Sequence, residues 1–154
     1  MGTVIIGSMK IISPEFNSGA KIPSKFTCDG EDINPALIIS DVPKEAKNLA
    51  LINDDPDAPA GTWVHWLIWN ISPDTVEVKE NSVPDGSIEG TTSFGGVGYG
   101  GPCPHSGEHR YVFKLYALDT MLDLPSGSNK EELLRAMEGH VVEQSELTGV
   151  YKRN

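Results

Sequence analysis

Glycine and proline recur along the whole chain, with 16 and 11 residues respectively among 154. Both residues interrupt helices and favour turns, so their wide spread predicts many short strands rather than long helices. A length near 150 residues is typical of one domain. A chain of this size buries about two thirds of its unfolded surface, and it therefore needs neither a disulfide nor a metal ion to fold.

Runs rich in apolar, β-branched and aromatic residues mark the expected strands. The strongest candidate is 62–71, which contains three tryptophans. Further strands are predicted at 34–40, 48–53, 110–117 and 140–151, with a polar strand or loop at 73–83. Strands do not alternate with helices, so the pattern indicates a mainly β fold, an antiparallel β-sandwich, with one or two short helices.

One helix is predicted near the end of the chain, at 128–138. Ser128 and Glu131 have the spacing of a capping box, in which each side chain satisfies a free backbone N–H group of the first turn. The apolar stripe that follows consists of Leu133, Leu134 and Met137. Gly139 then provides a stop signal.

The charge balance excludes several partners. Asp and Glu number 22 against 12 Lys and Arg, giving a net charge of −10. A nucleic-acid backbone requires clustered basic residues, and an anionic membrane surface attracts them, so neither is an expected partner. No segment approaches the roughly 20 apolar residues of a membrane span, so membrane insertion is not expected either.

The first residues do not resemble a signal peptide, because no basic segment precedes the short apolar run at 4–6. We therefore expect a cytoplasmic protein. Met9 begins a segment that looks like a natural start, so we predict a single domain at 9–154 and an N-terminal extension, 1–8, without assigned function.

The two cysteines, Cys28 and Cys103, lie 75 positions apart. This spacing does not match a zinc ribbon. In a reducing compartment the favoured interpretation is two free thiols. The alternative is one disulfide joining two loops, which requires a Cα–Cα distance of about 4.4–6.8 Å.

An acidic segment, DDPDAP at 54–59, directly follows an apolar strand. Pro56 favours an extended conformation at Asp55, and residues two apart in an extended chain face the same side. Asp55 and Asp57 are therefore predicted to form a carboxylate pair, which can hold a cation or an imidazolium. The alternative is that both aspartates simply stabilise turns beside prolines.

Two histidines lie in or beside apolar strands. Alternation places His65 on one face with Trp63, Leu67 and Trp69, as a satisfied core residue or as an imidazole in a cleft with aromatic walls. A buried polar group without a partner costs about 1–3 kcal/mol, so His65 needs one. His109 and Tyr111 share a face, and Arg110, which lies between them, points to the other face, where a structural ion pair is its expected role.

The segment 87–109 is glycine-rich and lacks periodicity. So long a loop within a small domain is often functional. Its Gly100-Gly101-Pro102-Cys103-Pro104 run can present backbone N–H groups to an anion. The chain contains no P-loop, no GxGxxG between a strand and a helix, no GxSxG and no HExxH motif, and no serine stands out as a nucleophile.

Together these segments resemble the phosphatidylethanolamine-binding protein family, in its prokaryotic, Raf-kinase-inhibitor-like branch. The matching segments are PSKFTCDGEDINPAL at 23–37, DPDAP at 55–59, WVHWLIWNI at 63–71, TSFGGVGYGGPCP at 92–104 and GEHRYVFKLYALD at 107–119. The resemblance extends from about Met9 to Lys152. It implies a Greek-key antiparallel β-sandwich with a small anion pocket near one end.

The same resemblance implies the residues of that pocket: Asp55, Asp57, His65, Gly101, Pro104, His109 and Tyr111. His105 stands where this branch commonly has proline, and it would add an imidazole at the rim. The C-terminal helix of eukaryotic members has no counterpart in this chain, so their lipid specificity and kinase regulation do not carry over directly.

Three functions follow as hypotheses. The first is binding of a small anion such as phosphate or a phospholipid headgroup. Imidazolium groups would hold the anion, and Asp55 and Asp57 would maintain their charge. Such a protein could modulate signalling through a protein partner. The second is a hydrolase that uses His65 or His109 as general base and Tyr111 or an aspartate as acid. The third is a metal site built from Asp55, Asp57, His65 and His109. We expect no cofactor, and a homodimer.

Overall fold

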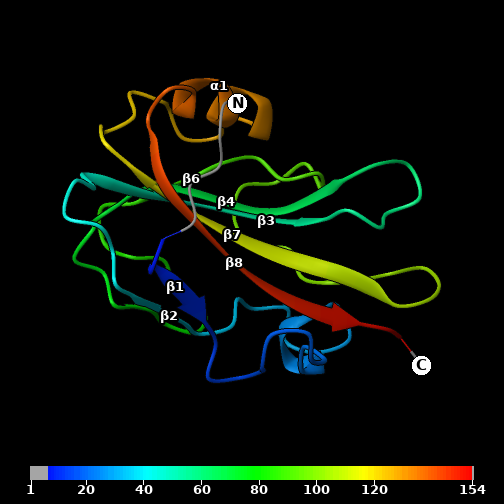
Figure 1. The fold of residues 1–154 in the computed structure, drawn as a ribbon. Coiled ribbons are helices and arrows are strands. Elements are labelled where there is room, and N and C mark those ends of the chain that lie inside the picture. The colour runs from blue at the N-terminus through cyan, green and yellow to red at the C-terminus, as the bar shows by residue number, and fades with distance from the viewer. Residues whose placement is uncertain (1–6, 154) are drawn as a thin grey trace.

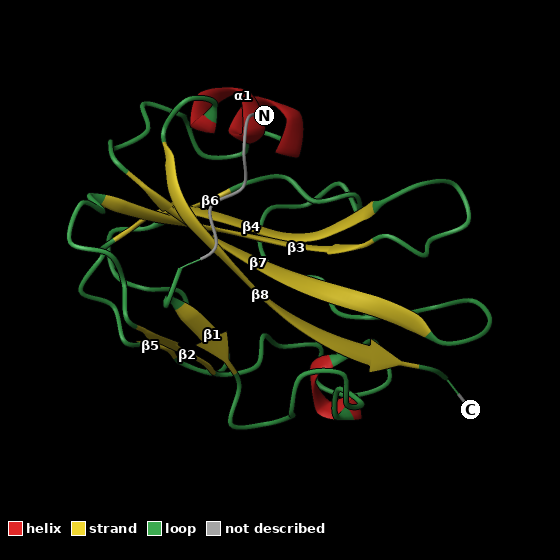
Figure 2. Cartoon of the chain, in the orientation of Figure 1, coloured by secondary structure: helices red, strands yellow, loops and turns green. Residues whose placement is uncertain are grey.

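The computed structural model describes residues 7–153, which form two antiparallel β-sheets, one α-helix and one short 3-10 helix (Figures 1 and 2). The small sheet has the order β1 (Lys10–Ile12), β2 (Leu37–Ser40), β5 (Glu77–Val78). The large sheet has the order β6 (Ile88–Glu89), β4 (Trp63–Ile71), β3 (Asn48–Asp55), β7 (His109–Leu118), β8 (Val141–Tyr151). The helices are η1 (Ser24–Phe26) and α1 (Lys130–Met137). The predicted mainly β, antiparallel fold is confirmed.

The large sheet contains a Greek-key order. Strands β3, β4 and β6 are successive antiparallel neighbours, and β7 returns to pair with the free edge of β3. Strand β5 lies between β4 and β6 in the sequence but joins the small sheet. This return places the start of β7 beside the end of β3, and the candidate site lies at that position.

Both faces of the large sheet are buried at its central strands β3 and β4, because two layers cover them. Leu49 and Leu51 of β3 face the core between the two sheets, while Ala50 and Ile52 face a second apolar cluster under α1. In Figure 2 the helix and the small sheet lie on opposite sides of the long strands. Strands buried on both faces read as continuous apolar runs, which is why periodicity in β3 and β4 is weak.

Helix α1 is confirmed, but its cap differs from the prediction by one residue. Asn129, not Ser128, is the N-cap, and it forms a capping box with Glu132. The Ser128 hydroxyl instead donates to the carbonyl of Pro125. Both side-chain pairs have the spacing of the motif, so the sequence alone does not separate them. Leu133 and Met137 are buried under the helix, as predicted.

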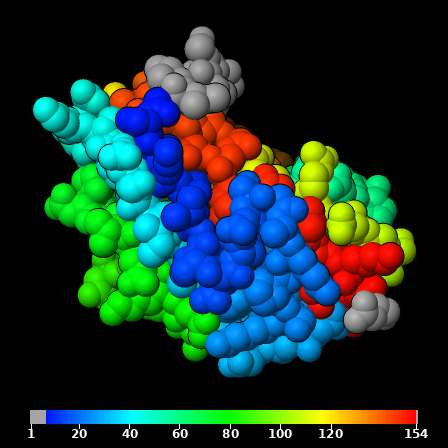
Figure 3. Space-filling model, turned by 60° about the horizontal axis from the view of Figure 1, so that its bottom comes forward, coloured from blue at the N-terminus to red at the C-terminus, as the bar shows by residue number. Residues whose placement is uncertain are grey.

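The N-terminal segment runs along the C-terminal strand, as the adjacent blue and red surfaces of Figure 3 show. The backbone N–H of Gly19 donates to the carbonyl of Thr148, and that of Ile22 to the carbonyl of Val150. Strand β1 and helix η1 belong to this segment, and sequence patterns did not predict either.

Residues 1–6 of the expected N-terminal extension lie outside the described residues. Met9, where we expected the domain to begin, is buried. Its backbone N–H donates to the carboxylate of Glu143 on β8. Among the described residues, no helix is long and apolar enough to cross a membrane.

Candidate ligand-binding site

A cavity of about 470 Å³ opens at the end of the large sheet where β3 ends and β7 begins. Its polar residues are Asp55 of β3, His65 of β4, and His109 and Tyr111 of β7. Its other lining residues are Ala58, Pro59, Ala60, Trp63, Phe94, Cys103, Pro104 and His105. None of these lining residues is Lys or Arg, so any positive charge inside the cavity must come from an imidazole.

The central feature is an ion pair between Asp55 and His109. Strands β3 and β7 are antiparallel neighbours, so the end of β3 lies near the start of β7. Asp55 Oδ2 lies 2.6 Å from His109 Nδ1, and both residues are buried. A carboxylate only accepts hydrogen bonds, so Nδ1 donates and the second ring nitrogen, Nε2, is left for a ligand.

A β-bulge brings His65 into the cavity. Along the β3–β4 pair, Asn53 lies opposite Trp66 and Asp54 opposite Val64, so His65 is the extra residue. Regular alternation predicted that His65 would share a face with Leu67 and Trp69, but those two residues belong to the cluster under α1. The bulge shifts the alternation by one residue and turns His65 to the other face. The prediction that His65 shares a face with Leu67 and Trp69 is wrong. Of the three predicted neighbours, Trp63 alone lines the cavity together with His65.

The imidazole of His65 is held in one orientation. Its Nδ1 lies 2.6 Å from the carbonyl oxygen of Gly100, and its ring packs edge-on against Phe94 and Tyr111, with centroid distances of 5.3 and 5.2 Å. Burial lowers the pKa of His65, although the Gly100 carbonyl and Asp55 oppose this shift. We predicted that nearby carboxylates would raise the pKa of this imidazole. The effect of desolvation on the pKa of His65 is larger and has the opposite sign.

Tyr111 lies between the two histidines. Its ring packs against both, with centroid distances of 5.2 Å to His65 and 6.4 Å to His109. The residue is 1% exposed, and its hydroxyl has no hydrogen-bond partner among the described residues. Burial raises the pKa of Tyr111, so its hydroxyl keeps its proton and can donate it in a hydrogen bond.

Asp57 does not pair with Asp55 as we predicted. Its carboxylate accepts hydrogen bonds from Arg110 Nε at 2.9 Å and Nη2 at 2.8 Å, and from the Arg110 backbone N–H. These bonds hold the pKa of Asp57 at about 2. Its own backbone N–H donates to Asp55 Oδ1, which keeps Asp55 in place. Asp57 therefore supports the site from outside the cavity, and Arg110 has the structural role expected of it.

The glycine-rich loop contributes to the site differently from the prediction. Pro104 and His105 line the cavity, as expected, but Gly101 does not. The backbone N–H of Gly101 donates to Asp32 at 2.8 Å, so it is not available to an anion. A Cβ atom at this position would collide with the carbonyl oxygen of Phe26. The loop thus needs glycine at this position for close packing.

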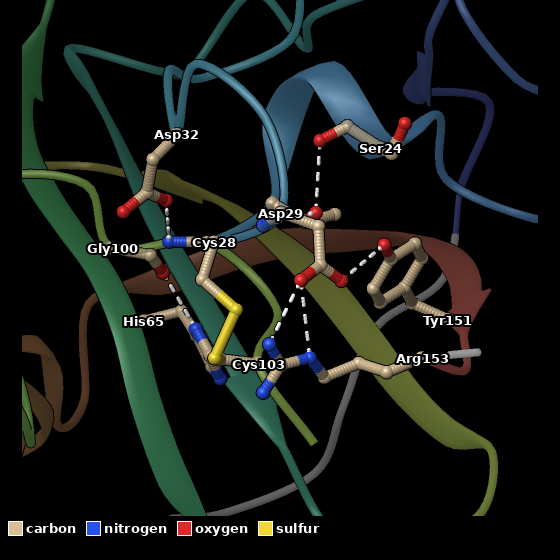
Figure 4. Close-up of a disulfide and its surroundings, with 11 residues drawn as sticks. Ser24, Cys28, Asp29, Asp32, His65, Gly100, Cys103, Tyr151 and Arg153 are labelled. Atoms are coloured by element: carbon tan, nitrogen blue, oxygen red, sulfur yellow. Dashed lines mark hydrogen bonds and ion pairs between the residues drawn. A yellow bond between two sulfur atoms is a disulfide. The ribbon is translucent and has the colours of Figure 1, made fainter. Parts of the chain in front are cut away.

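A disulfide between Cys28 and Cys103 ties this loop to the segment after η1 (Figure 4). The Cα atoms are 5.4 Å apart, within the range stated for the disulfide alternative, so the favoured interpretation of two free thiols is wrong. The Cys28 backbone N–H also donates to the carbonyl of Pro102. Because Cys103 lines the cavity, the cross-link fixes one of its walls.

A second cleft, of about 630 Å³, shares His105 with the cavity. Its other lining residues are Lys21, Ser24, Asp29, Tyr151 and Arg153. The cleft contains two cationic side chains, Arg153 and Lys21. The Arg153 guanidinium donates to Asp29 at 2.9 Å. These two cations make the second cleft an alternative place for an anion.

The described residues include no group of three or more His, Cys, Asp or Glu side chains arranged to hold a metal ion. Of the four ligands proposed from sequence, Asp57 is paired with Arg110, and Asp55 with His109. The metal hypothesis therefore gains no support from this geometry.

Residues 12–152 match the model of the phosphatidylethanolamine-binding protein family. The chain belongs to this family. It is 53% identical to a UPF0098 protein of Methanothermobacter thermautotrophicus, over 94% of this chain and 99% of that protein.

Two solved structures of family proteins are similar to this chain. One is of a phosphatidylethanolamine-binding protein homologue from Chlamydia trachomatis (TM-score 0.92, 42% identity, 95% of this chain and 98% of the other). The second is of Escherichia coli YbcL, described as a member of the mammalian family (TM-score 0.90, 28% identity, 96% and 100%). The predicted family is thus confirmed.

Sequence reasoning offered aromatic walls around His65 as one alternative, but it did not identify Phe94 as part of them. Phe94 is half-exposed, and its ring packs edge-on against Trp63, with the centroids 5.5 Å apart. A single phenylalanine in a glycine-rich loop could have indicated a cavity wall, because such a side chain does not belong to the buried face of a strand or helix. The cavity therefore combines a polar floor with an apolar mouth.

Proposed function

We propose that this chain binds a small oxyanion, such as phosphate or a phosphorylated group, in the cavity. The observation that carries the proposal is the buried Asp55–His109 pair beside the unpartnered Tyr111 hydroxyl. Protonated His109 and Tyr111 are two hydrogen-bond donors, and a buried donor without an acceptor costs about 1–3 kcal/mol. An oxyanion supplies acceptors to both.

Calorimetric titration with inorganic phosphate between pH 5 and 9 tests the proposal. Binding should depend on the imidazole of His109, because it is the group in the cavity that can give an oxyanion a charge-assisted hydrogen bond. His109→Gln and Tyr111→Phe should each weaken binding about tenfold or more, which corresponds to about 1.4 kcal/mol. Asp55→Asn should also weaken binding, since the carboxylate no longer holds the imidazole of His109.

The chain offers a matched control in a second His–Asp pair. His140 Nδ1 lies 2.8 Å from Asp119 Oδ1, but these side chains are 44% and 50% exposed, and neither lines the cavity. His140→Gln and Asp119→Asn should leave phosphate affinity unchanged. If Lys21→Ala abolishes binding while His109→Gln does not, the anion occupies the second cleft and the proposal is wrong.

The Asp55–His109 pair also favours a second candidate function, hydrolysis by a water molecule that His109 activates as general base. A carboxylate that orients an imidazole is common to such sites. The cavity lining contains no serine or threonine, and Cys103 is in the disulfide, so water would be the nucleophile. Turnover of p-nitrophenyl phosphate that His109→Gln abolishes would support this function.

A modulating role in signalling, a protein partner, a homodimer and a cytoplasmic location remain proposals. Sedimentation analysis tests the homodimer. The location can be tested through the disulfide, since reducing compartments keep most cysteines as thiols. Alkylation of Cys28 and Cys103 in freshly lysed cells would support the cytoplasm, and complete protection would count against it.

A further inference from the structure

The hydrogen bonds of His65 fix which of its ring nitrogens carries the hydrogen. Nδ1 lies 2.6 Å from the carbonyl oxygen of Gly100, and a carbonyl oxygen only accepts. Nδ1 must therefore donate, and in the neutral ring the second nitrogen, Nε2, carries a lone pair. The described residues provide no partner for Nε2, and His65 lines the cavity. Figure 4 shows the bond to Gly100 beside the disulfide-linked loop.

The surroundings of His65 favour its neutral form. The residue is 2% exposed, with the rings of Phe94 and Tyr111 against it, and desolvation lowers its pKa. The charged or titratable groups around it are Asp55 from β3, Asp32 and His105 from the loops, and His109 and Tyr111 from β7, while Asp54 contributes from the opposite face of the sheet. The carboxylates favour a charged ring, but their effect is smaller than that of burial.

The polar floor of the cavity thus differs from a simple anion site. Protonated His109 and Tyr111 donate hydrogen bonds, whereas His65 Nε2 accepts one. A ligand that satisfies all three must carry oxygen acceptors and also one hydrogen of its own. The charges agree with this requirement: Asp55 balances His109, so a doubly charged ligand would bring two uncompensated charges close to Asp32, in a protein of net charge −10.

We propose that His65 makes the cavity selective for an oxyanion that carries a proton, namely the monoanion of phosphate or of a phosphomonoester, whose P–OH donates to His65 Nε2. This inference rests on the proposed function. A phosphodiester carries the same single charge but no P–OH, so it places an oxygen lone pair against the lone pair of Nε2. A fully ionised phosphomonoester does the same and adds a charge.

Methyl phosphate and dimethyl phosphate are the matched probes. At pH 5 both are monoanions, because the second pKa of a phosphomonoester is about 6, and only methyl phosphate carries a hydrogen on oxygen. Calorimetry on the full chain should give at least tenfold tighter binding of methyl phosphate. Inorganic phosphate, measured alongside to separate free phosphate from an ester, should also bind more tightly than the diester.

The pH profile separates the proton of the ligand from that of the protein. Dimethyl phosphate does not titrate between pH 5 and 9, so any change in its affinity comes from the protein. The ratio of the two affinities reports the P–OH group, and it should fall up to tenfold per pH unit above about pH 6. This comparison uses the wild-type chain and does not depend on the folding of any variant.

His65→Gln should bring the affinity ratio at pH 5 close to one, because an amide can turn its NH₂ group toward either ligand. A steric preference for the smaller ligand would survive this substitution. His140→Gln should keep the wild-type ratio. Equal binding of both probes by the wild type, with His109→Gln still weakening both, would overturn this inference and leave the proposed function standing. Binding of neither probe would overturn both.

Discussion

The two faces of the large sheet treat two neighbouring carboxylates in opposite ways. Asp54 points to the face covered by α1, where Oδ2 accepts from Lys130 at 2.7 Å and from Lys114 at 3.3 Å. Asp55 points to the face with the cavity, where its partner is His109. Both aspartates are buried, at 0% and 3% exposure, and they come from consecutive positions of one strand.

The two aspartates differ in whether the partner side chain keeps a polar atom free for a ligand. Lys114 and Lys130 balance Asp54 with ammonium groups, and neither of them lines the cavity. His109 balances Asp55 through one ring nitrogen and keeps the second for a ligand. A buried carboxylate paired with lysine thus stabilises the fold, whereas one paired with a cavity-facing imidazole prepares a binding site. This division can be tested by substitutions on both faces and in the loops that flank the cavity.

The largest effect is expected from the disulfide, which holds the cavity side of the molecule. Its cysteines are 75 residues apart, and the chain-entropy relation gives about 4.5 kcal/mol for a loop of that length. Cys28→Ser combined with Cys103→Ser should therefore lower the free energy of unfolding in urea by about 2–4 kcal/mol, with reductant as a parallel treatment. Reductant should not affect the double variant. A loss below about 0.5 kcal/mol would mean that the hydrogen bonds around Asp32 and Pro102 hold the loop in place without the disulfide.

The same substitution at adjacent positions tests the comparison directly. Asp54→Asn should lower the free energy of unfolding by about 2 kcal/mol, less than for a fully buried ion pair because both lysines reach solvent. It should leave phosphate affinity within twofold of the wild type. Asp55→Asn should show the reverse pattern, with a smaller loss of stability and altered binding. Equal effects of both variants on binding would remove the distinction between the two faces.

Gly101 tests whether the loop holds His65 through close packing. In Gly101→Ala the added methyl would collide with the carbonyl oxygen of Phe26, and overpacking of this kind costs about 1–3 kcal/mol. The shift of the neighbouring Gly100 carbonyl should also weaken discrimination between methyl and dimethyl phosphate. Gly96→Ala is the control, since a Cβ atom there meets nothing within 4 Å. Equal unfolding midpoints for the two variants would contradict the packing explanation.

Sequence reasoning predicted most of the strands, the helix and the family, because hydrophobic runs and local motifs carry that information. It placed His109 and Tyr111 on one face, and Arg110 on the other, since β7 is regular there. It placed His65 with the wrong neighbours because a bulge depends on the register between β3 and β4, which a single strand does not encode. It paired Asp57 with Asp55 because the position of Arg110 on another strand was unknown.

The smallest effect is expected from the ion pair outside the cavity. Arg110→Ala removes the side-chain partners that keep the pKa of Asp57 at about 2, and this pKa should return toward its usual value of 3.8. A lowered pKa in the folded state stabilises the protein at pH values above the unfolded pKa and loses this effect as pH falls toward 2. The stability difference between wild type and variant should therefore be constant near neutral pH and vanish at acidic pH.

Both members of this pair reach solvent, with side-chain exposures of 59% for Arg110 and 30% for Asp57, so the difference in unfolding midpoint should be small. Phosphate affinity should be unchanged, because the Asp57 backbone N–H still donates to Asp55 after the substitution. Carboxyl NMR titration and calorimetry measure the two quantities separately. A loss of affinity as large as that of His109→Gln would show that Arg110 reaches the ligand, and that it belongs to the binding site rather than to its support.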